Sequence, residues 1–422
     1  MKFNYTFLIA LVLFGSATSS AQQDSLLFYQ AEGKIIDGKT GKPVVYTNIV
    51  ISGTNIGTIA NIEGKFTLKI PLNDTAESVV ISSIGYINKV IRISQLKTTN
   101  NLIKLDPATL DLAEIYIRPQ DARELLISAL NNIRNNYSTE PSMVTAFYRE
   151  SIRRKRKYVA VGEAVLDSYK ASYTKPLDRD RIKILKARKS TDFQKKDTLA
   201  LKLVGGPFSM FQLDFVKSPE EILEREILQY YEYEFTGQVV FGNKLAYVIS
   251  FVQRPDIEVP LFEGKYYIEA ETLAFLGAEY RINEEKKNRA SEFMVKQKPP
   301  GVEVDIEKAY YNVNYRYSFG KWHLSYVRTE LALSMKWEKM HFRSRYYLIT
   351  EMAITDLDTV NITRFKNQNT VNNRDVFIEQ VGNFEDPGFW GDYNIIHPEE
   401  PIQSAIKRMG RKLRRKTINA GD

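Results

Sequence analysis

The sequence predicts a mainly β protein: an N-terminal seven-stranded β-sandwich, then an α+β domain built on a large curved antiparallel sheet with a few helices. Aromatic residues make up 12% of the chain, with 25 Tyr and 22 Phe, and such residues favour strands. Short β-rich runs separated by turn residues occupy the front of the chain, and longer runs joined by short turns occupy its second half. The 422 residues are enough for two or three domains.

The composition limits the chemistry that the chain can perform. It has no Cys and three His, which excludes thiol and disulfide chemistry and leaves few ligands for zinc. Its formal net charge of +8 suits anionic surfaces without requiring nucleic acid. We therefore expect no cofactor, no metal and no nucleic-acid partner.

Residues 1–21 have the pattern of a secretory signal peptide. Lys2 supplies the positive start, residues 7–14 are uniformly apolar, and small residues precede Gln22, the expected mature start. No Cys follows the apolar run, which excludes a lipid-modified N-terminus, and no later stretch is long enough for a transmembrane helix. We expect an exported protein that is periplasmic or associated with the outer membrane.

Residues 22–108 are predicted to form the sandwich. Glycine-containing turns such as Asp37-Gly38 and Glu63-Gly64 separate short strands, and Pro71 ends one of them. Seven closely spaced strands predict a small antiparallel sandwich. The seven runs are Glu32–Ile36, Val44–Ile51, Thr58–Ala60, Lys65–Ile70, Ser78–Ile84, Asn88–Ile93 and Asn101–Leu105.

The same segment carries a family resemblance. The motifs are Gly33-Lys34-Ile35-Ile36-Asp37, Thr40-Gly41-Lys42-Pro43-Val44, Ile51-Ser52-Gly53-Thr54, Gly57-Thr58, Asn61-Ile62-Glu63-Gly64-Lys65-Phe66 and Ile84-Gly85-Tyr86. In this order they resemble the carboxypeptidase-regulatory-like domain, a transthyretin-like sandwich common at the front of Bacteroidetes envelope proteins. The resemblance covers residues 31–106. It implies an interaction module and no catalysis by the sandwich itself.

Residues 109–140 are predicted to form a connector and one helix. Asp121 is a good N-cap, and apolar residues recur at helical spacing as far as Tyr137. We expect this helix to pack on the sheet of the second domain, with a partner-binding helix as the alternative.

Residues 141–395 are predicted to form the antiparallel sheet domain, with a helix in its concavity. Tyr residues alternate with polar residues from Tyr311 to Ser318, which is typical of a half-buried strand. The expected strands are 230–240, 244–252, 264–270, 273–281, 303–317, 321–333 and 343–353. The candidate ligand or partner surface is formed by Tyr311, Tyr315, Tyr317 and Trp322.

Segments 242–249 and 267–273 resemble the lipoprotein-carrier half-barrel of bacterial envelopes. The resemblance implies that a concave apolar face could hold an acyl chain or another lipid-like ligand. The alternative is that the face is filled by the protein's own side chains.

Two basic segments and an aromatic tail complete the chain. We interpret Arg153–Lys157 as a solvated turn or strand edge, with phosphate binding as the alternative. Trp390 and Tyr393, in a closing segment similar to that of Bacteroidetes proteins with the same front domain, are expected to fasten the chain end to the sheet. Residues 396–422 form a predicted basic helix and tail. Its candidate contacts with an anionic membrane surface are Arg411, Lys412, Arg414 and Arg415.

The sequence contains no complete catalytic pattern. His397 and Glu400 have the HxxE spacing of zinc carboxypeptidases, but no further His follows. No Gly-x-Ser-x-Gly motif or phosphate-binding glycine loop occurs. Among 51 acidic residues, the sequence alone cannot place a catalytic carboxylate pair.

The sequence therefore predicts a non-enzymatic, exported cell-envelope protein with a binding or scaffold role. Its expected partner is an envelope protein or a lipid-like ligand held on the curved sheet. The alternatives are a carboxylate-based hydrolase acting on glycan, and a small outer-membrane β-barrel or receptor accessory. The oligomeric state stays open.

Overall fold

The structure is a computed structural model, and it describes most of the chain. The described residues are 28–72, 74–108, 121–175, 177–192, 206–242, 244–287, 290–291, 301–338, 342–372, 374–382 and 389–419. Beyond residue 411 the description covers only the backbone of the last helix. The predicted signal peptide and most of the connector lie outside these ranges.

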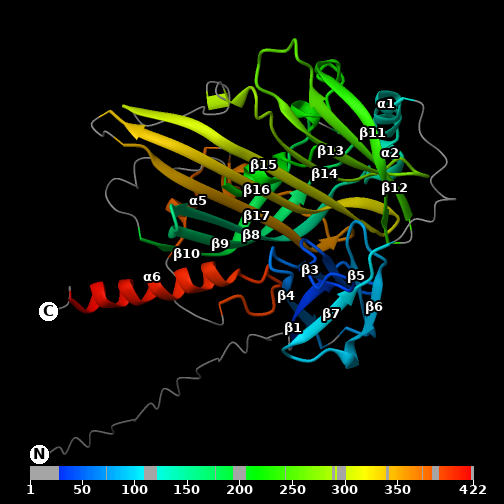
Figure 1. Cartoon of the computed structure of the whole chain (residues 1–422). Coiled ribbons are helices and arrows are strands. Elements are labelled where there is room, and N and C mark those ends of the chain that lie inside the picture. The colour runs from blue at the N-terminus through cyan, green and yellow to red at the C-terminus, as the bar shows by residue number, and fades with distance from the viewer. Residues whose placement is uncertain are drawn as a thin grey trace, which may run out of the picture.

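The front of the chain forms two small sheets around one core (Figure 1). One sheet has the order β4-β1-β7 and the other the order β3-β2-β5-β6. The predicted sandwich is confirmed, but the expectation of a wholly antiparallel one is wrong, because β1 and β7 run parallel. The strands are β1 (Phe28–Asp37), β2 (Asn48–Ile51), β3 (Gly57–Ile59), β4 (Lys65–Pro71), β5 (Ser78–Ser82), β6 (Lys89–Arg92) and β7 (Asn101–Leu105).

The second part of the chain is dominated by one antiparallel sheet of ten strands. Its order is β10-β9-β8-β17-β16-β15-β14-β13-β12-β11. The seven predicted strands are all present as β11–β17, and three strands that precede them complete the sheet. The bounds are β8 (Ser142–Arg154), β9 (Lys157–Lys170), β10 (Arg181–Thr191), β11 (Tyr231–Phe241), β12 (Lys244–Gln253), β13 (Phe262–Glu269), β14 (Phe275–Ile282), β15 (Val302–Ser318), β16 (Lys321–Trp337) and β17 (Ser344–Asp358).

Turn chemistry explains the predicted β15–β16 hairpin. Phe319 and Gly320 both have positive φ, at 49° and 76°, and they join strands in which Ser318 pairs with Lys321. Two central residues with positive φ match the twist of the flanking strands, and glycine adopts that conformation without strain.

The two faces of the large sheet contribute to different apolar clusters. Successive side chains of a strand point to opposite faces. Along β17, Leu348 and Met352 belong to the main apolar core, whereas Ala353 belongs to a separate cluster with Ile59 of the front sandwich. We call the first side the inner face and the second the outer face.

Helices cover the inner face. Asp121 caps α1 (Ala122–Asn131) as predicted, through bonds from the amides of Arg123 and Glu124. The helix breaks at Asn132, so the expected single helix to Tyr137 is instead α1 followed by the short α2 (Ile133–Asn136). α1 packs against β11, and α3 (Gly206–Gln212) also contributes to the core. The expected packing of a helix on the sheet is confirmed.

The last helix lies along β9 and β10, at the edge of the sheet (Figure 1). This helix, α6 (Glu400–Asn419), confirms the predicted basic helix. Residues 389–399 precede it and run between the sandwich and the sheet. The remaining short elements are α5 (Phe377–Gln380) and the 3-10 helices η1 (Ile93–Gln95), η3 (Pro219–Glu221), η4 (Leu228–Tyr230) and η6 (Asn367–Asn369).

A close approach between two strands gives a testable prediction. Gly264 on β13 pairs with Tyr280 on β14, and a Cβ at Gly264 would lie 2.7 Å from the Tyr280 Cα. We expect Gly264→Ala to push the strands apart and lower the free energy of unfolding by about 1–3 kcal/mol. Urea denaturation measures the loss. Gly382→Ala is the control, because its Cβ would meet nothing within 4 Å, and an equal loss in both variants would contradict the prediction.

Candidate functional site

The four residues of the predicted ligand surface differ in their exposure to solvent. Tyr311, Tyr315 and Trp322 are buried in the inner core, and the Tyr315 hydroxyl donates to Asp214 at 2.6 Å. Tyr317 is 56% exposed and packs edge-on against Trp322. Three of the four rings are thus buried in the protein's own core, and Tyr317 is partly exposed to solvent.

The inner face as a whole is densely packed with aromatic rings. Phe251 stacks on Tyr266 with 4.6 Å between ring centroids, and Tyr280 stacks on Tyr311 at 4.8 Å. Phe215, between α3 and η3, packs against the rings of both Tyr266 and Tyr315. These contacts show that the protein's own rings occupy this part of the inner face.

A cluster of buried charged side chains lies beside this core. Lys170 lies 2.9 Å from Asp180 and 2.7 Å from Asp214, and Lys217 lies 3.0 Å from Asp180. Burial acts to lower the pKa of Lys170, but the two carboxylates outweigh it and the pKa is raised. Buried charges of this kind are stable only when they are paired, as these are.

A second ion-pair network lies on the outer face. Arg149 donates to Glu163 at 2.7 Å, to Glu351 at 2.9 Å and to the carbonyl of Ile396 at 2.8 Å. Arg328 donates to the other Glu351 oxygen at 2.8 Å. These side chains are almost fully buried, because the sandwich and the segment before α6 cover them. Arg188, Glu330 and Glu399 extend the network.

A hollow of about 1380 Å³ lies on the outer face, at the end of the sheet away from the sandwich. Tyr347 of β17 pairs with Arg153 of β8, and each follows or precedes a residue of the inner core, so both point outward. Six cationic and two anionic side chains line the hollow, for a net charge of +4. The cations are Arg153, Lys155, Arg156, Lys287, Arg343 and Arg345, and the anions are Asp305 and Glu307.

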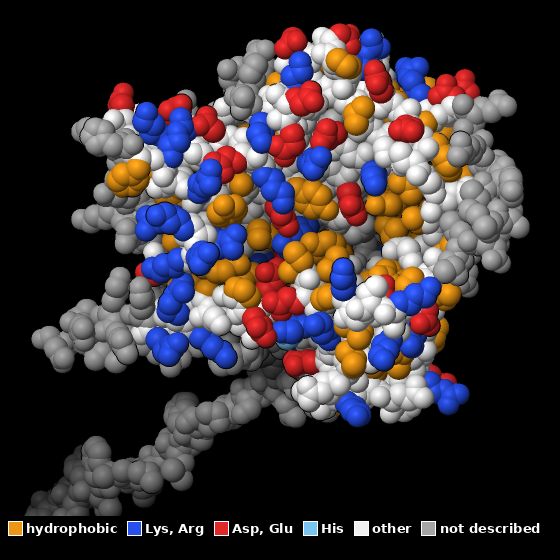
Figure 2. Space-filling model, in the orientation of Figure 1, with side chains coloured by type: hydrophobic (Ala, Val, Ile, Leu, Met, Phe, Trp, Pro, Cys, Tyr) orange, Lys and Arg blue, Asp and Glu red, His pale blue; other side chains and the backbone are white. Residues whose placement is uncertain are grey.

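Part of this charge is neutralised by carboxylates in or beside the hollow, and part is not. Lys287 pairs with Glu284 at 2.5 Å, outside the lining. Arg343 pairs with Glu303 at 2.8 Å and with Asp305, and Arg345 pairs with Glu307 at 2.9 Å. The Arg153 guanidinium lies over the Tyr347 ring, 4.7 Å from its centroid. Lys155 and Arg156 have no carboxylate partner among the described residues. Figure 2 shows Lys and Arg gathered over this side of the molecule.

Strand pairing assembles the hollow from distant segments. The basic run Arg153–Lys157 is the β8–β9 turn, as predicted, with Lys155 at φ 55°. Arg343 directly precedes β17 and Arg345 lies at its start, and β17 pairs with β8 across almost two hundred residues. No local pattern in the sequence indicates that pairing, so the sequence indicated only the first half of the site.

The predicted anionic-surface residues lie on α6. Its apolar side, with Ile402, Ala405 and Met409, is buried against Tyr158 and Val161 of β9. Arg411 is exposed. The backbone of α6 carries Lys412, Arg414 and Arg415, whose side chains lie outside the described residues.

Comparison with known proteins assigns the front of the chain. Residues 31–117 match the model of the CarboxypepD_reg-like domain. This finding confirms the resemblance seen in the sequence motifs. No curated protein sequence matches the chain.

Solved structures align with about three fifths of the chain at low similarity. A DUF1329 family protein from Desulfovibrio piger aligns at 11% identity and a TM-score of 0.24, over 58% of this chain and 96% of its own. A domain described as an outer membrane lipoprotein-sorting protein, from Vibrio parahaemolyticus, aligns at 10% identity and a TM-score of 0.25, over 58% and 96%. Lipovitellin aligns at 9% identity and a TM-score of 0.25, over 60% and 28%. TM-scores this low do not establish a shared fold.

The CarboxypepD_reg-like domain is fastened to the sheet by many polar contacts. Asn55 donates to the carbonyl of Leu357 at 2.7 Å and accepts from Arg316 through its own carbonyl at 2.9 Å. The Gly85 amide donates to the carbonyl of Val240 at 2.7 Å. A cavity of about 260 Å³ remains at this junction, where burial raises the pKa of Glu279.

The tail joins the same domain from the other side. Trp390 packs edge-on against Phe147 at 5.4 Å, which confirms that it fastens the chain end to the sheet. His397 Nδ1 lies 2.8 Å from the Thr67 hydroxyl, and Glu400 pairs with Lys65 at 3.0 Å. The HxxE pair of the sequence therefore contacts the CarboxypepD_reg-like domain.

The described residues offer neither a metal site nor a membrane-spanning helix. In that part of the chain, no group of three or more His, Cys, Asp or Glu side chains is arranged to hold a metal ion. Within the same ranges, no helix has both the length and the apolar character needed to cross a membrane.

Proposed function

We propose that this protein is a non-enzymatic binding protein of the cell envelope, and that its binding surface is the basic hollow on the outer face of the large sheet. The observation that carries the proposal is the hollow's net charge of +4, with Lys155 and Arg156 lacking carboxylate partners among the described residues. Clustered cations in a concave surface concentrate anions from solution. The proposed ligand is therefore anionic.

The filled core on the inner face supports the outer hollow as the binding surface. The sequence suggested an apolar ligand on the curved sheet, and the inner face is the apolar one. Its rings pack against one another and against α1 and α3. An apolar ligand there would have to displace the protein's own core, whereas an anion meets the outer hollow without displacing packed side chains.

The envelope location and the absence of catalysis are parts of the same proposal. The signal-like residues 1–21 support export. The three-His composition and the contacts that His397 makes with Thr67 and Gln403 support a binding role over hydrolysis. The CarboxypepD_reg-like domain, held by the sheet and the tail, would then serve as a scaffold element.

Titration with a compact polyanion tests the proposal. We expect the full chain to bind inositol hexakisphosphate in isothermal titration calorimetry, with affinity falling as salt is raised from about 50 to about 300 mM. Replacing Arg153, Lys155 and Arg156 by Gln is expected to weaken binding by about tenfold or more, since each lost ion pair is worth up to about 1 kcal/mol.

The control variant removes the same charge elsewhere. Lys39, Lys42 and Lys97 are exposed on the CarboxypepD_reg-like domain, and their replacement by Gln removes three charges far from the hollow. Binding that is unaffected by the hollow variant, or equally reduced by both variants, would rule out the hollow as the site.

A further inference from the structure

We infer that the anionic ligand of the hollow is the surface of a phospholipid membrane, which the hollow meets together with α6. This inference rests on the proposed function, because it names the partner of the same site. It is drawn from the extent of the basic surface, from an exposed aromatic side chain next in sequence to one of its residues, and from the way α6 is held beside it.

The size and openness of the basic surface suit an extended partner. A volume of about 1380 Å³ exceeds that of ordinary small-molecule pockets, which are about 300–1000 Å³. Figure 2 shows the basic side chains continuing from this end of the sheet toward α6. Many separate phosphate groups in a plane match such a surface better than one small anion does.

An exposed aromatic residue comes next in sequence to a residue that lines the hollow. Phe342 is 65% exposed and directly precedes Arg343, just before β17 begins. A Phe beside Arg and Lys is the combination that binds a membrane interface, where the ring enters the headgroup region and the cations meet the phosphates. A soluble polyanion would use the cations but offers no apolar region for this ring.

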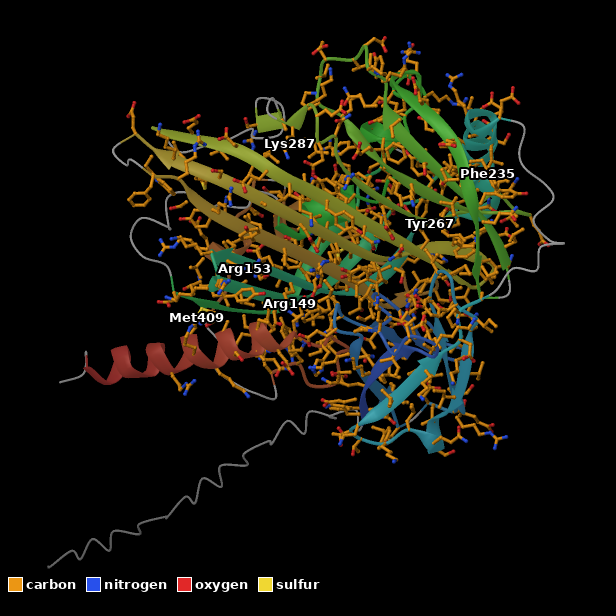
Figure 3. All side chains as sticks on the ribbon, viewed as in Figure 1. Arg149, Arg153, Phe235, Tyr267, Lys287 and Met409 are labelled. Atoms are coloured by element: carbon orange, nitrogen blue, oxygen red, sulfur yellow. The ribbon has the colours of Figure 1, made fainter. Side chains whose placement is uncertain are left out.

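Helix α6 extends the basic surface next to the hollow. Its apolar residues are buried on β9, and Arg408 donates to the carbonyl of Tyr158 at 3.0 Å, so the helix is fixed on the sheet. Lys407 and Arg411 are left exposed. Figure 3 shows Met409 of α6 beneath the end of β8 that carries Arg153. The helix therefore binds lipid through its charges and not by inserting its apolar side.

The electrostatic attraction of such a surface is large. Each Lys or Arg close to an anionic leaflet adds severalfold to membrane affinity, and the attraction fades within a Debye length. Removing three cations from the hollow is therefore expected to weaken binding to anionic vesicles by about a hundredfold. Neutral vesicles are expected to bind the protein poorly.

Vesicle co-sedimentation of the full chain tests the inference. One vesicle is phosphatidylcholine alone, and the other contains about one third phosphatidylglycerol, which gives the negative surface potential of an anionic leaflet. We expect binding to the second only. The variant with Arg153, Lys155 and Arg156 replaced by Gln is expected to lose it, and the Lys39, Lys42 and Lys97 control is expected to keep it.

The Phe342→Ser variant distinguishes binding to a lipid surface from binding to a soluble anion. This change leaves the charges in place, so we expect it to weaken vesicle binding severalfold while the affinity for inositol hexakisphosphate is unchanged. Equal effects on both ligands, or none on vesicles, would overturn the membrane assignment.

The two proposals fail in distinguishable ways. Binding of inositol hexakisphosphate at the hollow without binding to anionic vesicles would leave the proposed function standing and indicate an acidic protein or soluble polyanion instead. Loss of vesicle binding by the control variant as well would overturn the inference, since it would show attraction by net charge alone. Binding to neither ligand would overturn both proposals.

Discussion

Arg149→Met is expected to lower the free energy of unfolding by about 3–5 kcal/mol, the largest effect of any single substitution considered for this protein. The guanidinium binds Glu163, Glu351 and the Ile396 carbonyl. The side chains of Arg149 and of both glutamates are almost fully buried. Met fills similar space but leaves two carboxylates with fewer partners in a low-dielectric environment. Arg149→Lys is also expected to be costly, because one ammonium cannot reproduce the forked geometry.

Urea denaturation followed by tryptophan fluorescence measures this effect, since Trp390 packs on Phe147 next to the network. The control is Arg254→Gln, which breaks an exposed pair with Asp256 and is expected to change the free energy of unfolding by less than about 1 kcal/mol. If the two variants unfolded at the same urea concentration, the buried network would not stabilise the fold as argued.

The network also shows why the outer face was harder to predict than the strands. The alternation from Tyr311 to Ser318 correctly predicted a strand, but it predicted a half-buried one, whose polar side would face solvent. Asn312 and Arg316 are in fact buried, because the CarboxypepD_reg-like domain lies over them. Alternation in the sequence indicates which residues share a face of a strand. It does not indicate whether another segment covers the polar face, and here the covering segment lies more than two hundred residues away.

The same distinction applies to the candidate site. Arg153–Lys157 could be recognised because its charges are consecutive, and the sequence placed it at a turn. Arg343 and Arg345 lie among ordinary surface residues, and only the pairing of β17 with β8 brings them to the same hollow. Alternation places Tyr311 and Tyr315 on one face of β15, and both lie on the inner face. It does not show that this face is filled, because Asp214 and Phe215, which contact Tyr315, come from a segment about a hundred residues away.

Glu150→Gln is expected to stabilise the protein above neutral pH by as much as about 3 kcal/mol. Glu150 is buried on β8, and its described hydrogen bond comes from the Tyr148 hydroxyl at 2.5 Å. Burial raises the pKa of Glu150 to about 7 from an ordinary 4.5, and the Tyr148 bond opposes that rise only in part. A rise of this size corresponds to about 3 kcal/mol between the two protonation states.

The direction of the pH dependence follows from which state holds the proton. Between pH 4.5 and about 7 the unfolded chain has released the Glu150 proton while the folded protein retains it, so stability falls as pH rises through this window. Above about pH 7 the folded protein must hold a buried charge, and the full loss of folding stability is reached.

Gln has nearly the same shape and cannot ionise, so the Glu150→Gln variant is expected to match the stability of the wild type near pH 5 and exceed it near pH 8. Urea denaturation at both pH values measures this, with Glu226→Gln as an exposed control. Parallel pH profiles for Glu150→Gln and the wild type would show that Glu150 stays ionised in the fold and that its burial is relieved by solvent.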